Sequence, residues 1–382
     1  MGKWVKRKLG EVAKTFTGLT YSPNQVSENG ILVLRSSNIK DEQLCLEDNV
    51  FVSMDIPERA IVHENDILIC VRNGSRNLIG KSTFIPKEAE GMAFGAFMTI
   101  LRSDLIEPRL LLYIWQSNSI QRQVANNIGA TINQITNTDF KNFDISYPST
   151  LSEQRRIASI LSSADKVIDS TQKLIAKYKS IKQGMMEDLF KPKEGWKKVK
   201  LGEVGEINPP NKESIPERFV YVDLESVVAG QLLFENIIVK KGAPSRAQRI
   251  TYENDVLYQT VRPYQKNNYI HKKAGNYVAS TGYALIRCNV NYSSDFVYYV
   301  LHTYKFESNV LGLCTGTSYP AIAPNNLKKI EIFVPDLSEQ CRIASILSSI
   351  DAKIESEEKV LEKYKNIKKG LMEKLLKEEE IL

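Results

Sequence analysis

One segment of about 40 residues occurs twice in this chain. "LSEQRRIASILSSADKVID" begins at Leu151 and "LSEQCRIASILSSIDAKIE" begins at Leu337, and the aligned segments 151–190 and 337–376 are identical at 25 of 40 positions. An internal repeat of this kind is a structural unit used twice, so it constrains the fold before any other feature does. The rest of the chain has to accommodate two nearly identical elements.

Both copies have apolar residues at heptad spacing, which predicts two long helices that pair along an apolar seam. Each seam is polar at the same step, and a single polar seam residue is suited to fixing the register of a helix pair. The predicted seam consists of Ile157, Leu161, Ala164, Ile168, Thr171, Ile175 and Tyr178 in the first copy and Ile343, Leu347, Ile350, Ile354, Glu357, Leu361 and Tyr364 in the second.

The ends of the helices carry recognisable signals. Thr150 with Glu153, and Asp336 with Glu339, have the spacing of a capping box, and Pro192 ends the first helix. A helix of about 40 residues is about 60 Å long at 1.5 Å per residue, which is longer than a compact domain needs. We therefore expect the two helices to form an antiparallel coiled coil within the chain. The alternative is two surface helices, each covering the core of its own domain.

The segments before each helix, called head 1 and head 2 here, repeat more faintly. Three anchors recur in order, while the loops between them differ: "WVKRKLGEV" with "WKKVKLGEV", "ENDILICVR" with "ENDVLYQTVR", and "IGATINQITNTDFKNFDISYP" with "CTGTSYPAIAPNNLKKIEIFVP". Runs such as "ILVLRS", "DILICV", "FVYVDL" and "KIEIFVP" predict strands. We expect an α+β, pseudo-twofold chain of head 1 (1–149), central helix (150–192), head 2 (193–335) and C-terminal helix (336–382).

Composition excludes several classes of protein. The 382 residues exceed what one core normally holds, and 42% hydrophobic with 25% charged residues is typical of a folded globular protein. The chain has neither an 18-residue apolar run nor a secretory signal, so we expect a cytoplasmic protein without membrane contact. Five scattered cysteines and three histidines argue against a disulfide framework and a zinc site. The net charge of +6 permits a polyanionic partner without requiring one.

Unlike loops on like scaffolds would read two unlike targets, as a bipartite, asymmetric DNA site requires. In this respect, and in "LSEQRRIASIL" with "LSEQCRIASIL", "KLGEV" at each head, and "NDIL" and "NDVL" followed by Arg72 and Arg262, the whole chain resembles the specificity subunits of type I restriction-modification systems. The resemblance implies a non-catalytic subunit with two target-recognition domains, whose paired helices set the half-site spacing.

The resemblance also implies partners. Besides double-stranded DNA, these are two modification subunits that methylate adenine, and restriction subunits that add DNA movement and cleavage. The chain itself would need no cofactor, because S-adenosylmethionine, ATP and Mg²⁺ are expected on the partner subunits. Two other readings stay open: a DNA adenine methyltransferase acting alone, and a coiled-coil adaptor that binds protein only.

Two motifs resemble enzyme sites without meeting their requirements. "NPPN" from Asn208 to Asn211 is similar to the base-holding motif of adenine methyltransferases, but Asn211 fills its aromatic position. We interpret it as a proline-rich turn after the first strand of head 2. "GSRNLIGKS" from Gly74 to Ser82 has five residues between its glycines where a phosphate-binding loop needs four, and a strand-like stretch follows it. We expect neither motif to be catalytic.

Candidate DNA contacts follow from the chemistry of base edges: arginine suits guanine, asparagine or glutamine suits adenine, and apolar groups meet the thymine methyl. Because Arg72 and Arg262 occupy matched positions, we expect them to hold phosphates or structural ion pairs rather than read bases. The unlike loops are the better specificity candidates. The predicted DNA-binding residues are Arg35, Ser36, Asn38, Arg72, Asn73, Ser75, Arg76, Lys81 and Asn133 in head 1 and Arg246, Arg262, Tyr264, Gln265, Lys266, Asn267, Thr317, Ser318 and Tyr319 in head 2, with Thr131 in the same turn as Asn133.

Overall fold

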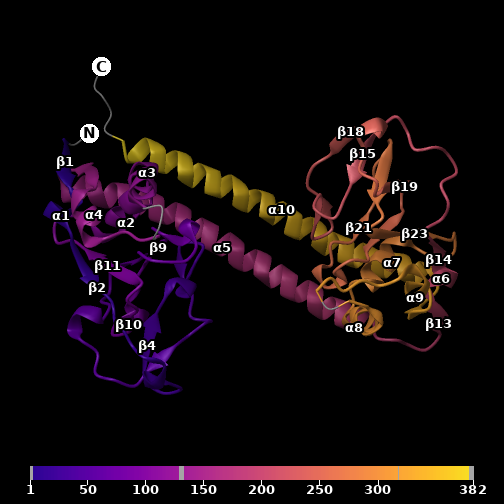
Figure 1. Cartoon of the computed structure of the whole chain (residues 1–382), viewed down its shortest axis with the longest axis horizontal. Coiled ribbons are helices and arrows are strands. Elements are labelled where there is room, and N and C mark those ends of the chain that lie inside the picture. The colour runs from indigo at the N-terminus through magenta and orange to yellow at the C-terminus, as the bar shows by residue number, and fades with distance from the viewer. Residues whose placement is uncertain (1–2, 129–132, 317, 378–382) are drawn as a thin grey trace. The chain divides into compact units, whose positions relative to one another are not determined.

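The computed structural model describes residues 3–128, 133–316 and 318–377, and it divides into two compact units. Unit 1 combines residues 1–172 with 359–382, and unit 2 holds residues 173–358. The two predicted long helices are confirmed as α5 (Leu151–Leu189) and α10 (Leu337–Leu375), each of 39 residues (Figure 1). Each unit therefore contains one head and a part of both helices.

Head 1 is built on two four-stranded sheets and two short ladders. The first sheet has the antiparallel order β2-β11-β8-β9, and in the second β10 runs parallel to β4. Their strands are β2 (Lys14–Thr17), β11 (Met98–Arg102), β8 (Ile67–Cys70), β9 (Ser82–Phe84), β10 (Ala93–Phe94), β4 (Ile31–Leu34), β7 (Phe51–Val52) and β3 (Val26–Ser27); the ladders pair β1 (Trp4–Lys8) with β12 (Asp144–Pro148) and β5 (Ile39–Lys40) with β6 (Gln43–Leu44).

The described part of head 1 also contains the short helices α1 (Leu9–Val12), α2 (Pro108–Gln116), α3 (Asn118–Asn127) and α4 (Asn137–Asn142). Helix α2 begins at a proline, which suits a first helical position because its missing N–H needs no partner there. Its Trp115 is buried, stacks on Phe140 with ring centroids 5.0 Å apart, and donates from Nε1 to the carbonyl of Gly80 over 2.8 Å. That bond fixes the end of the loop that follows β8.

Head 2 repeats this plan within unit 2. The sheet β14-β23-β20-β21 corresponds to β2-β11-β8-β9 of head 1, and a second sheet has the order β18-β15-β22-β19. Its elements are β13 (Lys197–Lys200), α6 (Leu201–Val204), β14 (Gly205–Ile207), β15 (Arg218–Val222), β16 (Val227–Val228), β17 (Gln231–Leu232), β18 (Asn236–Val239), β19 (Ala247–Thr251), β20 (Val256–Gln259), β21 (Tyr269–Ile270), β22 (Tyr277–Ser280), β23 (Tyr283–Cys288), α7 (Ser294–Val300), α8 (Tyr304–Leu313), α9 (Pro324–Leu327) and β24 (Glu331–Val334). The four predicted strand runs are confirmed as β4, β8, β15 and β24.

The repeated "LSEQ" attaches the start of each long helix to the head before it. Gln154 is buried; its side chain donates to the carbonyl of Pro148 (2.9 Å) and accepts from the backbone N–H of Glu107 (2.8 Å). Gln340 makes the two equivalent bonds in unit 2, at 3.0 and 2.9 Å. The first apolar turns then enter the core of the head, through Ile157, Ala158 and Leu161 in unit 1 and Ile343, Ala344 and Leu347 in unit 2.

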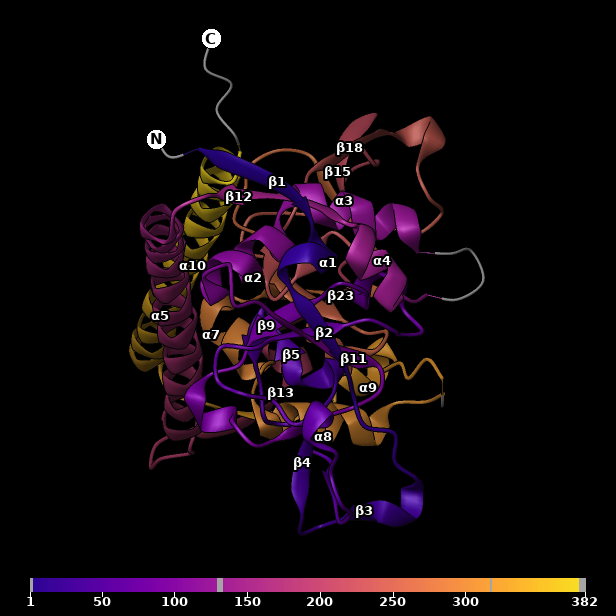
Figure 2. The same ribbon diagram turned by 90° about the vertical axis from the view of Figure 1, so that its left-hand side faces the viewer.

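In unit 1 the end of α10 packs against the same core as the start of α5 (Figure 2). The contacting residues are Leu371, Met372 and Leu375 of α10, with Leu376 directly after the helix. The two helices are also joined by charge: Asp165 of α5 pairs with Lys368 of α10 over 2.7 Å and accepts from the hydroxyl of Tyr113 over 2.5 Å. Lys368 is only 11% exposed and also pairs with Glu42 over 2.8 Å.

Unit 2 contains the counterpart of this network with the helices exchanged. Here Asp351 of α10 pairs with Lys182 of α5 over 2.6 Å and accepts from the hydroxyl of Tyr299 over 2.8 Å. The end of α5 contributes Met185, Met186 and Leu189 to the core of head 2, and Phe190 directly after the helix packs there too. Each of the three polar residues lies 186 positions from its equivalent in unit 1, so the repeat that is visible in the sequence has a matching set of contacts.

Most of the predicted seam is at least half-buried, and its first positions belong to the head cores described above. Thr171 is 8% exposed, and its hydroxyl donates to the carbonyl of Val167 on its own helix over 2.8 Å. Glu357 is half-buried. The heptad seam as a whole stays a prediction. Within the described part of the chain, no helix is both long enough and apolar enough to cross a membrane.

Each predicted capping box has one of its two hydrogen bonds, the one from the backbone N–H of the glutamate to the capping side chain. The N–H of Glu153 meets Thr150 Oγ1 at 3.5 Å and the N–H of Glu339 meets Asp336 Oδ1 at 2.9 Å, as predicted. The return bond predicted from each glutamate is wrong, because the carboxylate of Glu153 instead takes two bonds from Arg156 (2.6 and 2.8 Å), and Glu339 does the same with the arginine three residues later. A two-bond arginine pair is stronger than one bond to an N–H.

Candidate nucleic-acid interface

Three predicted segments of head 1 meet at the loop that follows β8. The side-chain amide of Asn73 donates to Ser36 Oγ over 3.2 Å, and that of Asn133 donates to the carbonyl of Gly74 over 3.0 Å. Asn73 also accepts from the backbone N–H of Ser75 over 2.9 Å, which closes an Asx turn. Segments far apart in sequence therefore form one polar surface. Thr131 lies outside the described residues.

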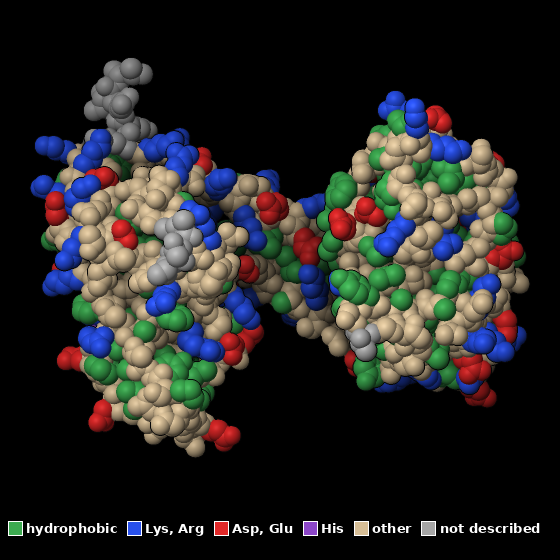
Figure 3. Space-filling view, viewed as in Figure 1, with side chains coloured by type: hydrophobic (Ala, Val, Ile, Leu, Met, Phe, Trp, Pro, Cys, Tyr) green, Lys and Arg blue, Asp and Glu red, His purple; other side chains and the backbone are tan. Residues whose placement is uncertain are grey.

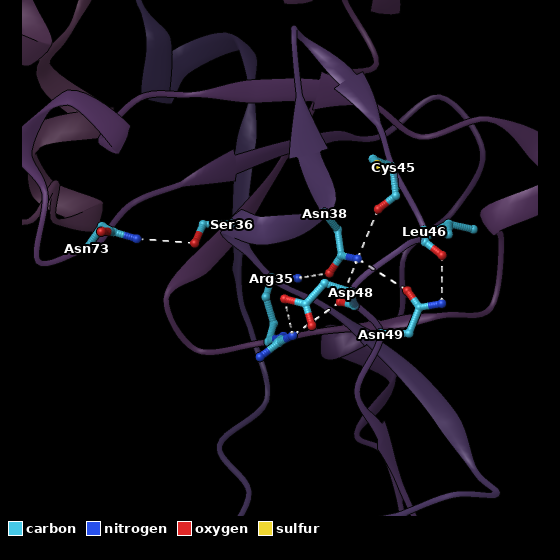
Figure 4. Close-up of polar contacts among 8 residues, drawn as sticks. All are labelled: Arg35, Ser36, Asn38, Cys45, Leu46, Asp48, Asn49 and Asn73. Atoms are coloured by element: carbon cyan, nitrogen blue, oxygen red, sulfur yellow. Dashed lines mark hydrogen bonds and ion pairs between the residues drawn. The ribbon is translucent and has the colours of Figure 1, made fainter. Parts of the chain in front are cut away.

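Next to Ser36, Arg35 and Asn38 join the loop before β5 to the residues that follow β6 (Figure 4). Asn38 is completely buried; it accepts from the N–H of Arg35 and donates to the carbonyls of Cys45 and Asp48. The guanidinium of Arg35 pairs with Asp48 over 3.0 Å. The side chain of Asn38 thus has no free edge to offer a base, whereas Ser36 remains half-exposed.

The loop from Gly74 to Ser82 is a short 3₁₀ turn, Arg76–Leu78, that leads into strand β9. A strand instead of a helix follows the second glycine, in agreement with the sequence-based reading. The guanidinium of Arg76 donates to the carbonyl of Ala125 in the last turn of α3 over 2.9 Å, where a cation is favoured by the helix dipole. Lys81 is half-buried at the start of β9.

Arg72 is exposed and lies over an aromatic ring. Its guanidinium carbon is 5.2 Å from the ring centroid of Phe97, which is 55% exposed and belongs to the turn between β10 and β11. The carbonyl of Phe97 accepts from the N–H of Val71 (2.9 Å) and of Arg72 (3.2 Å), so the turn is tied to the end of β8. Sequence reasoning missed Phe97; the only signal is a large apolar residue in a Gly-Ala turn.

Arg262 of head 2 also lies over an aromatic ring, that of Tyr319, at 4.3 Å, and Tyr319 is 66% exposed. The backbone N–H of Arg262 donates to the carbonyl of Pro320 over 2.7 Å. The segment is one residue longer than in head 1, so Val261 makes the bridge that Arg72 makes, and Arg262 follows it with a left-handed φ of 52°. Ser318 is exposed beside it, and Thr317 lies outside the described residues.

The rest of the head 2 loop is partly engaged. Lys266, also left-handed at φ 55°, pairs with Glu307 over 2.7 Å. Gln265 accepts from the side chain of Gln259 (2.8 Å), and Asn267 accepts from the N–H of Ala229 (3.4 Å). Tyr264 is 48% exposed, and Arg246, on a neighbouring turn, is exposed.

A buried chain of hydrogen bonds supports this loop from below. The N–H of Gln259 donates to Asn268 Oδ1 (2.9 Å), and Asn268 Nδ2 lies 3.3 Å from Nε2 of His302. Nδ1 of His302 lies 2.8 Å from the carbonyl of Tyr298, which can only accept, so Nδ1 carries the proton and Nε2 is the acceptor. Burial lowers the pKa of His302 to about 4, and the charge of Lys182 adds to the effect.

The ion pair considered for Arg72 and Arg262 belongs to other residues. Among the residues that the structure describes, neither arginine has a carboxylate partner. The buried acid of each "END" turn instead takes two bonds from an arginine on the neighbouring strand: Asp66 from Arg102 (2.6 and 2.7 Å), and Asp255 from Arg287 (2.9 and 2.7 Å). Hydrogen bonds to these carboxylates raise the pKa of Arg102 and of Arg287.

The "NPPN" segment is a turn, although it follows the second strand of head 2, β14, rather than the first. Asn211 donates to the carbonyl of Gln248 (2.8 Å) and accepts from the N–H of Ile250 (3.1 Å), and Asn208 accepts from the N–H of Leu285 (2.9 Å). Both asparagines thus tie strands together.

Charge alone does not locate a nucleic-acid surface. Lys and Arg side chains are spread over the visible face of both units and are interspersed with Asp and Glu (Figure 3). The loops after β8 and β20 differ from this background because each places an arginine beside an exposed aromatic ring, on matched strands of the two heads.

Comparisons with known proteins agree on one family. The profile described as type I restriction modification DNA specificity domain matches residues 1–179 and 193–366. A putative type I restriction enzyme MjaX specificity subunit from Methanocaldococcus jannaschii is 28% identical over 98% of this chain and 92% of its own length. The MjaVIII specificity subunit of that organism is 26% identical over 83% and 79%. The crystal structure of a type I restriction-modification S subunit from M. genitalium matches 99% of this chain and 97% of its own, with a TM-score of 0.62 and 17% identity.

Proposed function

Because the chain belongs to the family of type I restriction-modification DNA specificity domains, we propose that it is the DNA-recognition subunit of a type I restriction-modification complex. It binds a bipartite, asymmetric site in double-stranded DNA, with one half-site for each head. Its part is recognition and scaffolding, and the chemistry of methylation and cleavage belongs to its partners.

One observation carries this proposal: two heads share a frame and differ at the tips. The frame includes the ion pair between Asp66 and Arg102 with its counterpart in head 2, and the bonds of the repeated "LSEQ". The tips carry unlike polar and aromatic groups. Equal frames with unequal tips suit two different base sequences at a set separation.

The long helices are proposed to pair as an antiparallel coiled coil that fixes this separation. Support comes from each unit by itself: Asp165 pairs with Lys368 in unit 1, while unit 2 has the pair between Lys182 and Asp351 and another between Lys179 and Glu358, the latter at 2.7 Å. In both units, a residue of α5 meets a residue of α10. Helix length would then act as a ruler for the DNA between the half-sites.

The partners follow from the repeat. Exposed positions of α5 recur on α10, such as Ser159 with Ser345 and Lys177 with Lys363, so two copies of one partner can dock on matching faces. We assign these positions to two modification subunits, which would bring S-adenosylmethionine, with restriction subunits joining later and using ATP and Mg²⁺.

The test is a mobility-shift titration of the purified chain with random duplex DNA at low and moderate salt, followed by methylation mapping with the neighbouring modification subunit supplied. We expect steep salt dependence, because phosphate contacts release counterions, and a single two-part methylated sequence. DNA binding that is absent at low salt would favour the protein-only adaptor. Binding of S-adenosylmethionine by the chain alone would favour the solitary methyltransferase.

A further inference from the structure

We propose that the cation–π pairs Arg72–Phe97 and Arg262–Tyr319 are the base-reading elements of the two heads, each recognising a guanine and an adjoining pyrimidine in its half-site. The inference rests on the proposed function and deepens it. It also reverses the expectation that these two arginines serve phosphates or structure.

The first step concerns what the two arginines do within the protein. Structural arginines in these heads, such as Arg102 and Arg287, have buried carboxylate partners and two bonds each. Among the described residues, Arg72 and Arg262 have none, and Nε of Arg262 is buried without a hydrogen-bond partner. The terminal nitrogens of both guanidinium groups therefore have no partner within the described part of the chain, whereas the buried Nε of Arg262 is out of reach of a ligand.

The second step concerns the aromatic rings. Phe97 and Tyr319 are more than half exposed, although large apolar side chains normally gain from burial. Each ring lies within 6 Å of a guanidinium carbon, where cation–π attraction is favourable. The neighbouring ring limits the rotation of the arginine, whose donors lie along the edge of the planar guanidinium.

The third step is that the two rings come from different places in the frame. Phe97 immediately precedes β11, and the residue that precedes the corresponding strand β23 is Gly282. Tyr319 instead comes from the loop between α8 and α9. The arginines also differ, since Arg262 lies one residue beyond the bridging position that Arg72 occupies. The pairing of an arginine with an exposed ring is thus built in two different ways in the two heads. Descent of both heads from one ancestral head does not by itself explain this pairing, because the rings occupy different positions.

The backbone at both sites is fixed. Phe97 is held by two hydrogen bonds from the end of β8, and Arg262 keeps a left-handed conformation at φ 52° while donating to Pro320. Strained conformations of this kind persist where the surroundings enforce them, and they gather at binding sites. Both pairs are therefore set before DNA arrives.

The chemistry defines the ligand. A guanidinium edge with parallel donors matches O6 and N7 of guanine in the major groove, and an aromatic face meets the C5 methyl of thymine. Phe97 offers only an apolar surface, so head 1 should require thymine beside its guanine. The hydroxyl of Tyr319 can also donate and accept, so head 2 should accept cytosine as well.

The test is selection of bound sequences from a randomised duplex library by the full-length chain, with sequencing of the enriched pool. We expect Arg72→Lys to lower the preference for one guanine in one half-site about 10-fold while the other half-site is unchanged. Arg262→Lys should act on the opposite half-site only. Phe97→Ala should relax the neighbouring thymine, and Tyr319→Phe should narrow its pyrimidine position to thymine.

Arg122→Lys in head 1 and Arg218→Lys in head 2 are the matched controls, as exposed arginines outside these loops, and should leave the motif intact. Thermal unfolding of each variant checks that the fold is retained. If Arg72→Lys and Arg262→Lys enrich the wild-type motif unchanged, the inference is overturned while the proposed function stands. A wild-type chain that enriches no motif overturns both.

Discussion

The acid in each "END" turn joins that turn to the neighbouring strand of the central sheet of its head. Asp66 is 1% exposed, and it accepts both from the N–H of His63 and from two nitrogens of Arg102. It thereby holds the turn before β8 against β11. Asp255 makes the same set of bonds with Tyr252 and Arg287.

We predict that Asp66→Asn and Asp255→Asn each lower the free energy of unfolding by about 3 kcal/mol, because a half-buried arginine loses its counter-charge. Urea unfolding of the full chain measures this. Asp48→Asn is the control: its pair with Arg35 is 65% exposed on the acid side, so the loss should stay below about 1 kcal/mol. Equal losses for Asp48 and Asp66 would contradict the ranking.

His302 gives head 2 a dependence on acid. Its folded pKa, about 4, lies below the ordinary value of about 6.5, so the unfolded chain binds more protons between these values. The contribution of neutral His302 to the free energy of unfolding is complete above pH 6.5. It falls by up to about 3 kcal/mol as the pH decreases toward 4. Protonation at Nε2 would also remove the acceptor for the side-chain amide of Asn268. The oxygen of that amide accepts from the N–H of Gln259, at the start of the loop that contains Arg262.

Urea midpoints at pH 7.5 and 4.5 for the wild type and His302→Gln measure this effect. Carboxylates and the buried His271, whose pKa burial also lowers, titrate in both proteins, so the informative quantity is the difference between them. We expect the variant to lose less stability on acidification. A constant difference across the range would show that His302 does not titrate as described.

Sequence reasoning at this scale identified both arginines from their place after matched strands and expected a phosphate or a structural ion pair for each. The buried acid of each turn pairs instead with a different arginine, Arg102 or Arg287. Asp66 directly precedes β8, and Arg102 lies at the end of β11. The two residues become neighbours only because these strands pair in the sheet, and no local sequence pattern reveals that pairing. Phe97 was missed for a similar reason, since exposure of a phenylalanine depends on how its turn is packed.

At the scale of the helices, α5 and α10 each begin in the core of one head. The heptad pattern predicted their existence and length within a few residues, because apolar periodicity over 39 positions has few other interpretations. The pattern could not show which seam residues pack against a head and which face the other helix. Ile157 and Leu161 continue the same stripe as Ile175, and any apolar partner satisfies a stripe.

The pair between Asp165 and Lys368 offers a direct test of helix pairing in unit 1. We predict that Asp165→Lys alone lowers the free energy of unfolding by about 3 kcal/mol, because it places two cations side by side and removes an acceptor from Tyr113. Adding Lys368→Asp should recover at least about 1 kcal/mol. The same exchange at Asp351 and Lys182 serves as the matched experiment in unit 2. Additive losses in both units would exclude a direct pairing.

For the whole molecule, the order of head, helix, head and helix could be predicted because its anchors occur twice. The sheet order could not, since β2, β11, β8 and β9 are joined by pairings across many residues. The divergent loops between the anchors gave no repeat signal, and the parallel pair of β10 and β4 lies among them.

We predict that removing residues 169–175 and 355–361 together shortens the preferred spacer between half-sites or abolishes specific binding. Seven helical residues span about 10.5 Å, which equals about three base pairs of DNA. Selection from a library with variable spacers measures the outcome. Removing only one block should disturb the matching of the helices and cost stability. A spacer preference that survives the double deletion unchanged would mean that helix length does not set the distance.

The core of head 1 is completed by Leu371, Met372, Leu375 and Leu376, which lie far along the chain from the rest of that core. During synthesis these residues leave the ribosome about 200 positions after Leu161, roughly 10 to 40 s later at ordinary elongation rates. For that interval the nascent head has an apolar flank without its natural cover. Chaperones that bind such surfaces therefore have a defined moment to act, and a stalled or truncated translation product would keep that flank bare and be prone to aggregate.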